Sequence, residues 1–205
     1  MITVIAGVNG AGKSSIIGSN LRAKGASYFN PDEVTQLILK AHPEKSPDDA
    51  NSFAWQLGFD QLKQAIDKDL DYTFETTLGG NSICNELRRA IELGVQVTIL
   101  YCGLNSPELH IKRVAARVAK GGHDIPEAKI RTRWANSMAN LESLIPSCAE
   151  VAVFDNSAEL VDGKPTPTKL FAMHGDRFVA EPNSKDFPDW ALPLATAAIK
   201  RSLKK

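Results

Sequence analysis

The segment at residues 7–14 reads Gly-Val-Asn-Gly-Ala-Gly-Lys-Ser, a full match to the phosphate-binding pattern G-x-x-x-x-G-K-[ST]. It follows a short apolar, β-branched run at residues 2–6, and the residues after it are compatible with a helix. In this context the glycines let backbone N–H groups point inward, and the helix start adds free amides and its dipole. We therefore expect a nucleoside triphosphate to bind here, in contact with Gly7, Asn9, Gly10, Ala11, Gly12, Lys13, Ser14 and Ser15.

Two side chains of this loop have tasks of their own. Lys13 would reach the β- and γ-phosphates and assist catalysis, and the Ser14 hydroxyl would ligate Mg²⁺. Kinases, GTPases, motors and transporters all use such a loop. The chain has neither an N-K-x-D base-reading motif nor an L-S-G-G-Q signature, and it lacks an apolar strand that closes in Asp-Glu. What remains favours a small kinase.

Composition narrows the class of protein further. The 205 residues are the size of one α/β domain, and 24 basic and 24 acidic residues cancel, which argues against a general nucleic-acid or membrane-surface binder. The three cysteines, Cys84, Cys102 and Cys148, are widely separated and predict buried, reduced thiols. The first strand starts at residue 2, leaving no room for a signal peptide, and no apolar run would span a bilayer. We expect a cytoplasmic location.

Strand and helix signals alternate to about residue 155, which predicts an α/β, P-loop kinase-like domain at residues 1–157. Its mostly parallel five-stranded sheet would carry helices on both faces, with a helical lid at about 107–145. The strands are expected at 2–6, 27–29, 72–76, 95–102 and 151–154. Residues 158–205 would form a short C-terminal appendage packed on the same domain, with a hairpin at 169–180 and a helix at 190–203.

Asn30-Pro31-Asp32 opens a helix directly after the expected strand at 27–29. Asn30 would cap that helix, Pro31 suits its first turn, and Glu33 completes a capping box. The carboxylate of Asp32 could then face the crevice and take the proton of an acceptor hydroxyl. Asp32 could equally do no more than complement the helix dipole, as first-turn acids often do. Spacing alone leaves both roles open.

A second cluster follows the strand at 72–76 and comprises Glu75, Thr76, Thr77 and two glycines. Such a group of carboxylate and hydroxyl oxygens could bind sugar hydroxyls or hold a magnesium-bound water. The alternative is a solvent-exposed strand end followed by a flexible turn.

The basic residues of the expected lid form a third cluster. Arg113 and Arg117 lie four residues apart and so share a helix face, and two glycines at 121–122 could act as a hinge. Inward arginines would neutralise charge on the transferring phosphoryl group. Arg131 and Arg133 are two apart, so one of them at most is expected to face the crevice, and His123 would fix the turn. A solvated basic helix pair is the alternative.

Together these segments resemble the zeta-toxin family of P-loop kinases over roughly residues 1–157. The matching segments are residues 7–14, Asn30-Pro31-Asp32, Phe74-Glu75-Thr76-Thr77, the arginine helix at 111–117, Gly121-Gly122-His123-Asp124-Ile125-Pro126, Arg133 and Asn140-Leu141. Two features depart from the family pattern. Asn136-Ser137 stands where members often carry an arginine before a serine, and the chain lacks extensions that bind the sugar in longer members.

The resemblance implies phosphorylation of the 3′-hydroxyl of the amino sugar of UDP-N-acetylglucosamine, with ATP or GTP and Mg²⁺. By the same resemblance Asp32 is the base, Asn30, Glu75, Thr76 and Thr77 bind the acceptor, and the lid arginines meet the phosphates. It also implies a possible antitoxin protein that blocks the nucleotide site. The alternatives are a kinase for another acceptor, such as an antibiotic, a sugar acid or a nucleotide, or a nucleotide-dependent switch without an acceptor.

Overall fold

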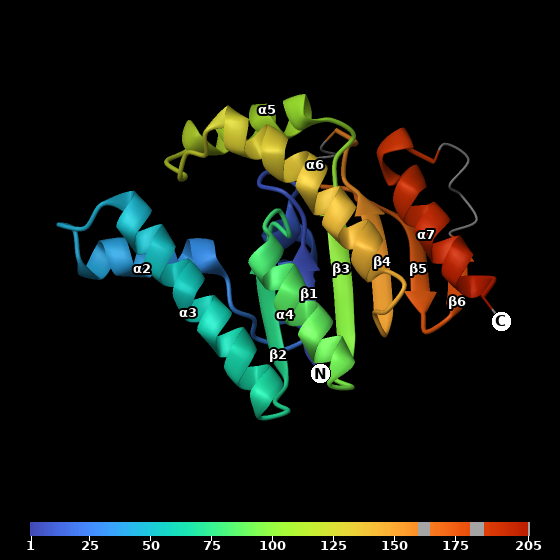
Figure 1. Ribbon diagram of the computed structural model, residues 1–205. Helices are drawn as coiled ribbons and strands as arrows, with labels where there is room; N and C mark the ends of the chain where they lie inside the picture. Colours follow the sequence, from blue (N-terminus) through green and yellow to red (C-terminus); the bar gives the residue numbers. More distant parts are fainter. Residues whose placement is uncertain (160–164, 181–186, 205) are drawn as a thin grey trace.

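The computed structural model describes residues 1–159, 165–180 and 187–204, which form one twisted sheet flanked by helices (Figure 1). Within these residues the sheet has six strands, in the order β2-β1-β3-β4-β5-β6. The four parallel strands are β1 (Ile2–Ala6), β2 (Tyr72–Thr76), β3 (Val97–Gly103) and β4 (Glu150–Asp155). The antiparallel hairpin of β5 (Thr168–His174) and β6 (Arg177–Ala180) extends the sheet beyond β4.

The α/β fold is confirmed, but the sheet differs from the expected one at both edges. Residues 27–29 form no strand and contribute a single parallel bridge between Phe29 and Phe74. Asn30 already caps the next helix, so the chain leaves the sheet after one pairing. At the other edge the hairpin adds two strands. The appendage predicted at 158–205 also includes residues 160–164, 181–186 and 205, which lie outside the described residues.

The helices begin where the sequence carries capping signals. The Asn30 side chain accepts a hydrogen bond from the backbone N–H of Asp32, and Ser106 accepts one from Leu109, each before a proline in the first turn. No helix among the described residues is long and apolar enough to cross a membrane. The helices are η1 (Ser14–Gly18), α1 (Ser19–Ala23), α2 (Pro31–Ala41), α3 (Pro47–Asp67), α4 (Asn81–Glu92), α5 (Pro107–Val118), α6 (Glu127–Leu144), η2 (Asp189–Ala191) and α7 (Leu192–Ser202).

The core lies on both faces of the sheet because successive strand residues point to opposite sides. Val4 packs in a large cluster with α4, α6 and α7, whereas its neighbour Ile5 packs with Ile16 and Ile17 of η1 on the other face. In Figure 1, α4 and α6 cross one face of the sheet, and α2 and α3 stand beside its β2 edge. Helices therefore cover both faces, as the sequence predicts.

The three cysteines occupy this interior. Cys84, Cys102 and Cys148 are buried and none of them is in a disulfide, as the sequence predicts. Burial raises the pKa of the Cys84 thiol to about 11 and that of Cys102 to about 12. Both thiols therefore stay protonated at neutral pH and have no nucleophilic character.

The first half of helix α3 turns a different face inward from the one that its apolar residues suggest, whereas Leu62, Ala65 and Ile66 in the second half are buried as their spacing predicts. Phe53 is 62% exposed and Leu57 is 37% exposed, although both fall at helical spacing. The buried stripe instead contains Ala50, Ala54 and Gly58. These small residues allow a close approach to neighbouring segments, and at Gly58 the neighbour is the ring of Phe29. The larger side chains of this first half of the helix are left at the surface and around the cavity described below.

Candidate active site

The glycine loop has the backbone form of a phosphate cradle. Gly12 has a φ of +90°, and a Cβ there would lie 2.7 Å from the Asn156 side chain. Gly10 has a φ of +86°, and a Cβ there would lie 2.9 Å from the His110 carbonyl oxygen. An L side chain at either position would be both strained and crowded. The loop keeps its shape because glycine alone fits there, and helix η1 starts directly after Lys13.

Lys13 is held at the base of this loop by a buried carboxylate. Its ammonium nitrogen lies 3.4 Å from Glu75 Oε1, and the two side chains are only 6% and 9% exposed. The Ser14 hydroxyl donates a 2.8 Å hydrogen bond to Glu75 Oε2. This meeting follows from topology, because β1 pairs in parallel with β2 and Ile5 lies opposite Glu75. Glu75 is therefore part of the phosphate-binding end and is not a solvent-exposed strand end.

The same pair of oxygens suits a hard cation. Mg²⁺ prefers oxygen ligands, keeps several waters and is usually bound by one or two protein oxygens together with substrate phosphates. The hydroxyl of Ser14 and the carboxylate of Glu75 are hydrogen-bonded to each other, and they lie beside the loop that would hold those phosphates. Their donor chemistry and their position fit such an ion.

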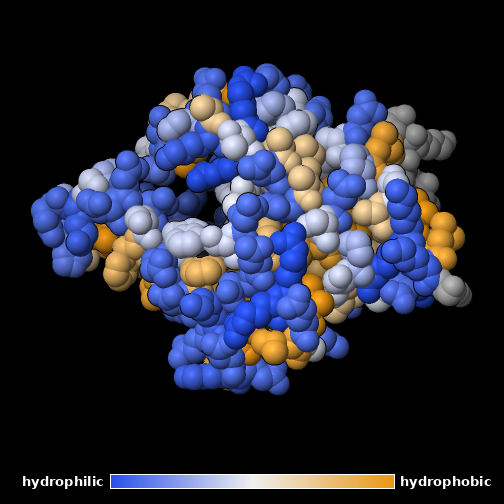
Figure 2. All heavy atoms as spheres, in the orientation of Figure 1, coloured by the Kyte–Doolittle hydropathy of each residue, from blue (hydrophilic) through white to orange (hydrophobic). Residues whose placement is uncertain are grey.

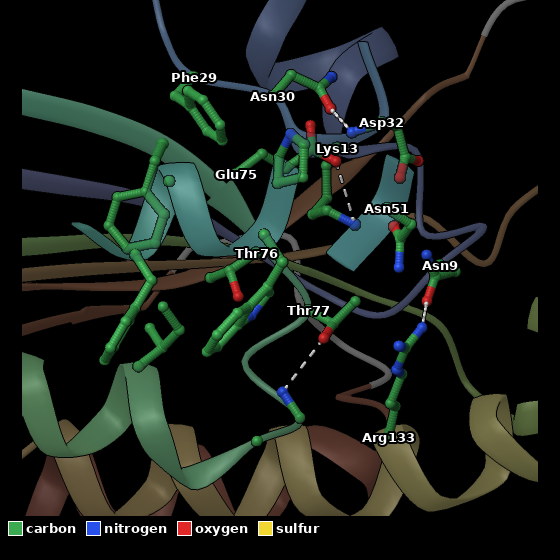
Figure 3. Close-up of a pocket in the computed structure, with 18 of the residues that line it drawn as sticks. Asn9, Lys13, Phe29, Asn30, Asp32, Asn51, Glu75, Thr76, Thr77 and Arg133 are labelled. Atoms are coloured by element: carbon green, nitrogen blue, oxygen red, sulfur yellow. Dashed lines mark hydrogen bonds and ion pairs between the residues drawn. The ribbon is translucent and has the colours of Figure 1, made fainter. Parts of the chain in front are cut away.

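A cavity of about 290 Å³ opens in front of Lys13. Figure 2 shows this face of the molecule hollowed between the α2–α3 hairpin and the helices α5 and α6. In the close-up, Lys13, Asp32, Asn9 and Arg133 gather on one side, and Phe29 lies on the other (Figure 3). The lining residues are Asn9, Lys13, Phe29, Asn30, Pro31, Asp32, Asn51, Trp55, Gly58, Phe59, Phe74, Glu75, Thr76, Thr77, Gly79, Gly80, Ser82, Ile83, Ile125 and Arg133.

Asp32 lies at the edge of this cavity on the first turn of α2. Its backbone N–H is bound by the Asn30 side chain, and Asn30 also lies within 3.5 Å of the Ser14 hydroxyl. The carboxylate of Asp32 lies 3.5 Å from the guanidinium of Arg117. The helix start therefore places a carboxylate in the wall of the cavity that Lys13 also lines, within ion-pair distance of a lid arginine.

The four arginines of the predicted lid have different environments. Arg117 contacts Asp32 and donates to the His123 carbonyl oxygen, whereas Arg133 lines the cavity and donates to Asn9 Oδ1 at 2.8 Å. Burial lowers the pKa of Arg133, although the group remains a cation. Arg113 donates to the Ala158 carbonyl oxygen and Arg131 pairs with Glu108. Of the four, Arg133 alone is among the described residues that line the cavity.

The threonines predicted to bind the acceptor are also fixed in place. The hydroxyl oxygens of Thr76 and Thr77 accept hydrogen bonds from the backbone N–H groups of Leu78 and Gly79. Both hydroxyls keep a proton with which to donate to a ligand. On the far side of this turn, Asn140 of α6 donates to the Leu78 carbonyl oxygen. The turn after β2 is thus attached to the helix that carries Arg133.

Two buried residues under the loop make contacts that sequence reasoning did not predict. His110, on α5, lies 2.8 Å from the Asn9 carbonyl oxygen through Nδ1, and burial lowers its pKa to about 4. The neutral ring therefore donates from Nδ1, an assignment made from its carbonyl partner. Asn156, after β4, donates to the Ala11 carbonyl oxygen. Both contacts join residues that are more than 100 positions apart in the sequence. No local sequence pattern predicts such contacts.

Comparison with known proteins agrees with this geometry. The family model described as zeta toxin matches residues 1–163. An uncharacterized protein of Haemophilus influenzae is 34% identical over 128 residues, which is 62% of this chain and 88% of that protein.

Solved structures support the same fold. A chain of the AvrRxo1-ORF1:-ORF2 complex with ATP has a TM-score of 0.66 at 15% identity, over 88% of this chain. The present chain spans only 60% of the length of that neighbour. A chain from the PezAT chromosomal toxin-antitoxin system of Streptococcus pneumoniae has a TM-score of 0.56 at 12% identity, over 100% of this chain and 88% of its own length. At these identities the likeness concerns the fold.

Proposed function

The chain belongs to the zeta toxin family, and from that premise we propose that it transfers the γ-phosphoryl group of ATP or GTP to a hydroxyl of a small acceptor. The first candidate for that acceptor is the amino sugar of UDP-N-acetylglucosamine, at its 3′-hydroxyl. The resemblance of the sequence motifs to those of UDP-N-acetylglucosamine kinases supports this choice.

One observation carries the proposal. The Lys13–Glu75–Ser14 cluster lies at the wall of a cavity that Asp32 also lines. A phosphate loop that serves only as a hydrolytic switch needs no acceptor cavity that opens in front of its lysine and is lined by a carboxylate. A kinase needs both, because the acceptor hydroxyl must lie in line with the transferring group.

The residues divide the chemistry among them. Lys13 and Arg133 would stabilise the negative charge on the transferring group, and Arg117 would join them from α5. Asp32 would take the proton of the acceptor hydroxyl while the new O–P bond forms and the bond to the β-phosphate oxygen breaks, leaving the nucleoside diphosphate. Ser14 and Glu75 would hold Mg²⁺, which supplies charge neutralisation between the phosphates when bound.

A protein partner, which the family suggests, and a cellular location are also part of the proposal. One neighbour was solved in a complex of two open reading frame products, and the other belongs to a toxin-antitoxin system. We expect that an antitoxin protein could cover the nucleotide site of this chain, and that the enzyme acts in the cytoplasm.

The test is incubation of the protein with Mg-ATP and UDP-N-acetylglucosamine, followed by mass spectrometry of the sugar nucleotide. The expected product is heavier by one phosphoryl group, and ADP release should rise when the acceptor is added. A Lys13→Ala variant is the matched control for contaminating kinases. ADP formation at the same slow rate with and without every acceptor tested would favour the switch, whereas stimulation by another compound alone would replace the acceptor.

A further inference from the structure

The cavity is divided between a charged side and an aromatic side. Its charged lining residues are Lys13, Asp32, Glu75 and Arg133, which come from the glycine loop, α2, β2 and α6. Helix α3 contributes no charged residue to the lining, and its four members are Asn51, Trp55, Gly58 and Phe59. A ligand that fills the cavity therefore meets phosphate-binding chemistry at one end and an uncharged wall along α3.

Three of the α3 residues form a stripe along the helix. Asn51, Trp55 and Phe59 are each four positions apart and so share one face. Each step advances about 6 Å along the helix axis. In Figure 3 Asn51 lies near Asp32 and Asn9, at the charged side. The stripe thus begins with Asn51 near the phosphate end. The ring of Trp55 follows about 6 Å along the helix, and that of Phe59 about 12 Å along it.

The aromatic rings pack on one another or on α3. Trp55 and Phe59 are stacked, with ring centroids 5.0 Å apart and an interplanar angle of 13°. Phe29 is pressed against α3, because a Cβ on Gly58 would lie 2.5 Å from its ring. We call Phe29, Trp55 and Phe59 the aromatic wall. Trp55 is nevertheless 42% exposed, so a large apolar surface remains open beside the cavity.

We infer that the aromatic wall is the subsite for the base of a nucleotide acceptor, an inference that rests on the proposed function of this cavity as the acceptor site. A planar base would stack on the wall, and its attached sugar would extend along α3 toward Asn51 and Asp32. The amide of Asn51 has no hydrogen-bond partner among the described residues, so it is available to the hydroxyls of that sugar.

The chemistry of the wall favours a base over other occupants. A polycationic antibiotic would meet no acidic residue among the α3 residues that line the cavity and would face the ammonium of Lys63, which lies 5.9 Å from the centroid of the Phe59 ring. A pyranose can lay the C–H face of its ring on such side chains, but its hydroxyls then need polar partners at the rim, and apart from the rings themselves α3 offers the lining only the amide of Asn51. A nucleobase covers such rings with its flat faces and keeps its polar edge free. The base of the donor nucleotide is the remaining competitor, and the experiment below separates it from the acceptor.

The test compares two pairs of probes. UMP and ribose 5-phosphate differ by the base, whereas UDP-N-acetylglucosamine and N-acetylglucosamine 1-phosphate differ by the uridine and one phosphate. Calorimetric titrations use UDP-N-acetylglucosamine against N-acetylglucosamine 1-phosphate, and UMP against ribose 5-phosphate. Base stacking on an aromatic side chain corresponds to about 5–100-fold in affinity. The wild type should bind UMP tighter than ribose 5-phosphate by that factor, and UDP-N-acetylglucosamine tighter than N-acetylglucosamine 1-phosphate by at least as much, because its ribose and second phosphate add contacts. Trp55→Ala should lose the difference between UMP and ribose 5-phosphate, and Trp55→Phe, which keeps a ring, should retain most of it.

Phe53→Ala is the matched control, because Phe53 is an exposed aromatic residue of the same helix that does not line the cavity. It should bind all probes as the wild type does. Circular dichroism melts of each variant report folding, and ATP affinity is measured in parallel. Loss of ATP binding in Trp55→Ala, with unchanged acceptor binding, would assign the wall to the donor and overturn the inference.

The inference and the proposed function can fail separately. Equal affinities within each probe pair would overturn the base subsite, and a sugar-only preference would assign the wall to the pyranose. Phosphorylation of UDP-N-acetylglucosamine with an unchanged KM in Trp55→Ala would leave the proposed function standing without this subsite. Trp55-dependent binding of UMP, without phosphorylation of UDP-N-acetylglucosamine, would uphold the subsite and call for another nucleotide acceptor.

Discussion

The Ser14 hydroxyl donates a 2.8 Å hydrogen bond to the Glu75 carboxylate, which joins the start of the helix after the phosphate loop to the end of strand β2. Glu75 also pairs with Lys13, so one carboxylate restrains both the phosphate-binding cation and the hydroxyl suited to Mg²⁺. The resemblance to the zeta-toxin family gives this residue a role in holding the sugar. Its contacts with Ser14 and Lys13 instead favour a role in holding Mg²⁺.

Replacement of Glu75 by Gln distinguishes these two roles. If Glu75 helps to hold Mg²⁺, the Mg²⁺ concentration at half-maximal rate should rise by about 10–100-fold, as is typical when a metal's supporting ligands are lost. The acceptor KM should change little. If Glu75 instead binds the sugar, the acceptor KM should rise while the Mg²⁺ dependence stays as in the wild type. Initial rates over a grid of Mg²⁺ and acceptor concentrations measure both quantities.

The burial of Lys13 predicts a stability effect in addition to a catalytic one. Lys13→Ala should abolish turnover and also leave the buried Glu75 carboxylate unpaired, a change that typically costs about 3–5 kcal/mol. The double variant Lys13→Met/Glu75→Gln should recover much of that stability and none of the activity. Urea unfolding of both variants measures the free energies. A Lys13→Ala protein as stable as the wild type would contradict the ion pair.

Local signals explain which parts of this fold could be predicted from the sequence. The strand before the glycine loop and the helix start at Asn30-Pro31 depend on neighbouring residues, and both lie as expected. The exposure of Phe53 could not be predicted, because it depends on small residues of the same helix meeting Phe29. The prediction of an edge strand at 27–29 was wrong for a related reason. These residues have a high strand propensity, but the helix cap at Asn30 takes the chain away from the sheet after one bridge.

The candidate site shows the same division. The phosphate loop, Asp32 and Glu75 follow strand ends or open helices, so topology brings them together. Spacing could not predict which arginine lines the cavity, because that depends on which turn of each helix packs against the glycine loop. The contact of His110 with Asn9 spans 101 positions and required the folded chain.

Arg133 and Arg131 provide a matched pair within one helix. Arg133 lines the cavity, whereas Arg131 pairs with Glu108 outside it. Arg133→Gln should lower kcat by about 10²–10³-fold, the usual effect of removing one donor that stabilises transition-state charge. Arg131→Gln should change kcat little and cost at most about 1 kcal/mol of stability, as is typical of an exposed ion pair. Equal kcat values for the two variants would show that Arg133 does not stabilise the transferring phosphoryl group.

The buried His110 predicts a fall in stability at acid pH. Its pKa is lowered by burial from 6.5 to about 4, so the folded state excludes a proton that the unfolded state accepts. The stabilisation is complete above pH 6.5 and is lost as the pH falls toward 4, at about 1.4 kcal/mol per pH unit. This residue should therefore cost the wild type about 2 kcal/mol at pH 5. His110→Asn, which keeps a donor near the Nδ1 position, should lack that component in urea unfolding at pH 7.5 and 5.

Asp32 and its neighbour Glu33 allow the general base to be tested against a charge-matched control. Both are acids in the first turn of α2, but Asp32 lines the cavity whereas Glu33 pairs with Arg22. Asp32→Asn keeps the shape of the side chain and cannot accept a proton at neutral pH. If Asp32 is the base, kcat should fall by about 10²–10⁴-fold with nucleotide affinity almost unchanged.

Glu33→Gln removes the same charge from the same helix turn. It should lower stability by about 0.3–1 kcal/mol through the helix dipole and leave kcat near the wild-type value. Melting temperature, nucleotide affinity and kcat are measured on one preparation of each variant. If Asp32→Asn behaves like Glu33→Gln, with slightly lower stability and near-normal kcat, Asp32 serves the helix and another group must take the proton. A large kcat defect confined to Asp32→Asn would instead identify its carboxylate as the proton acceptor.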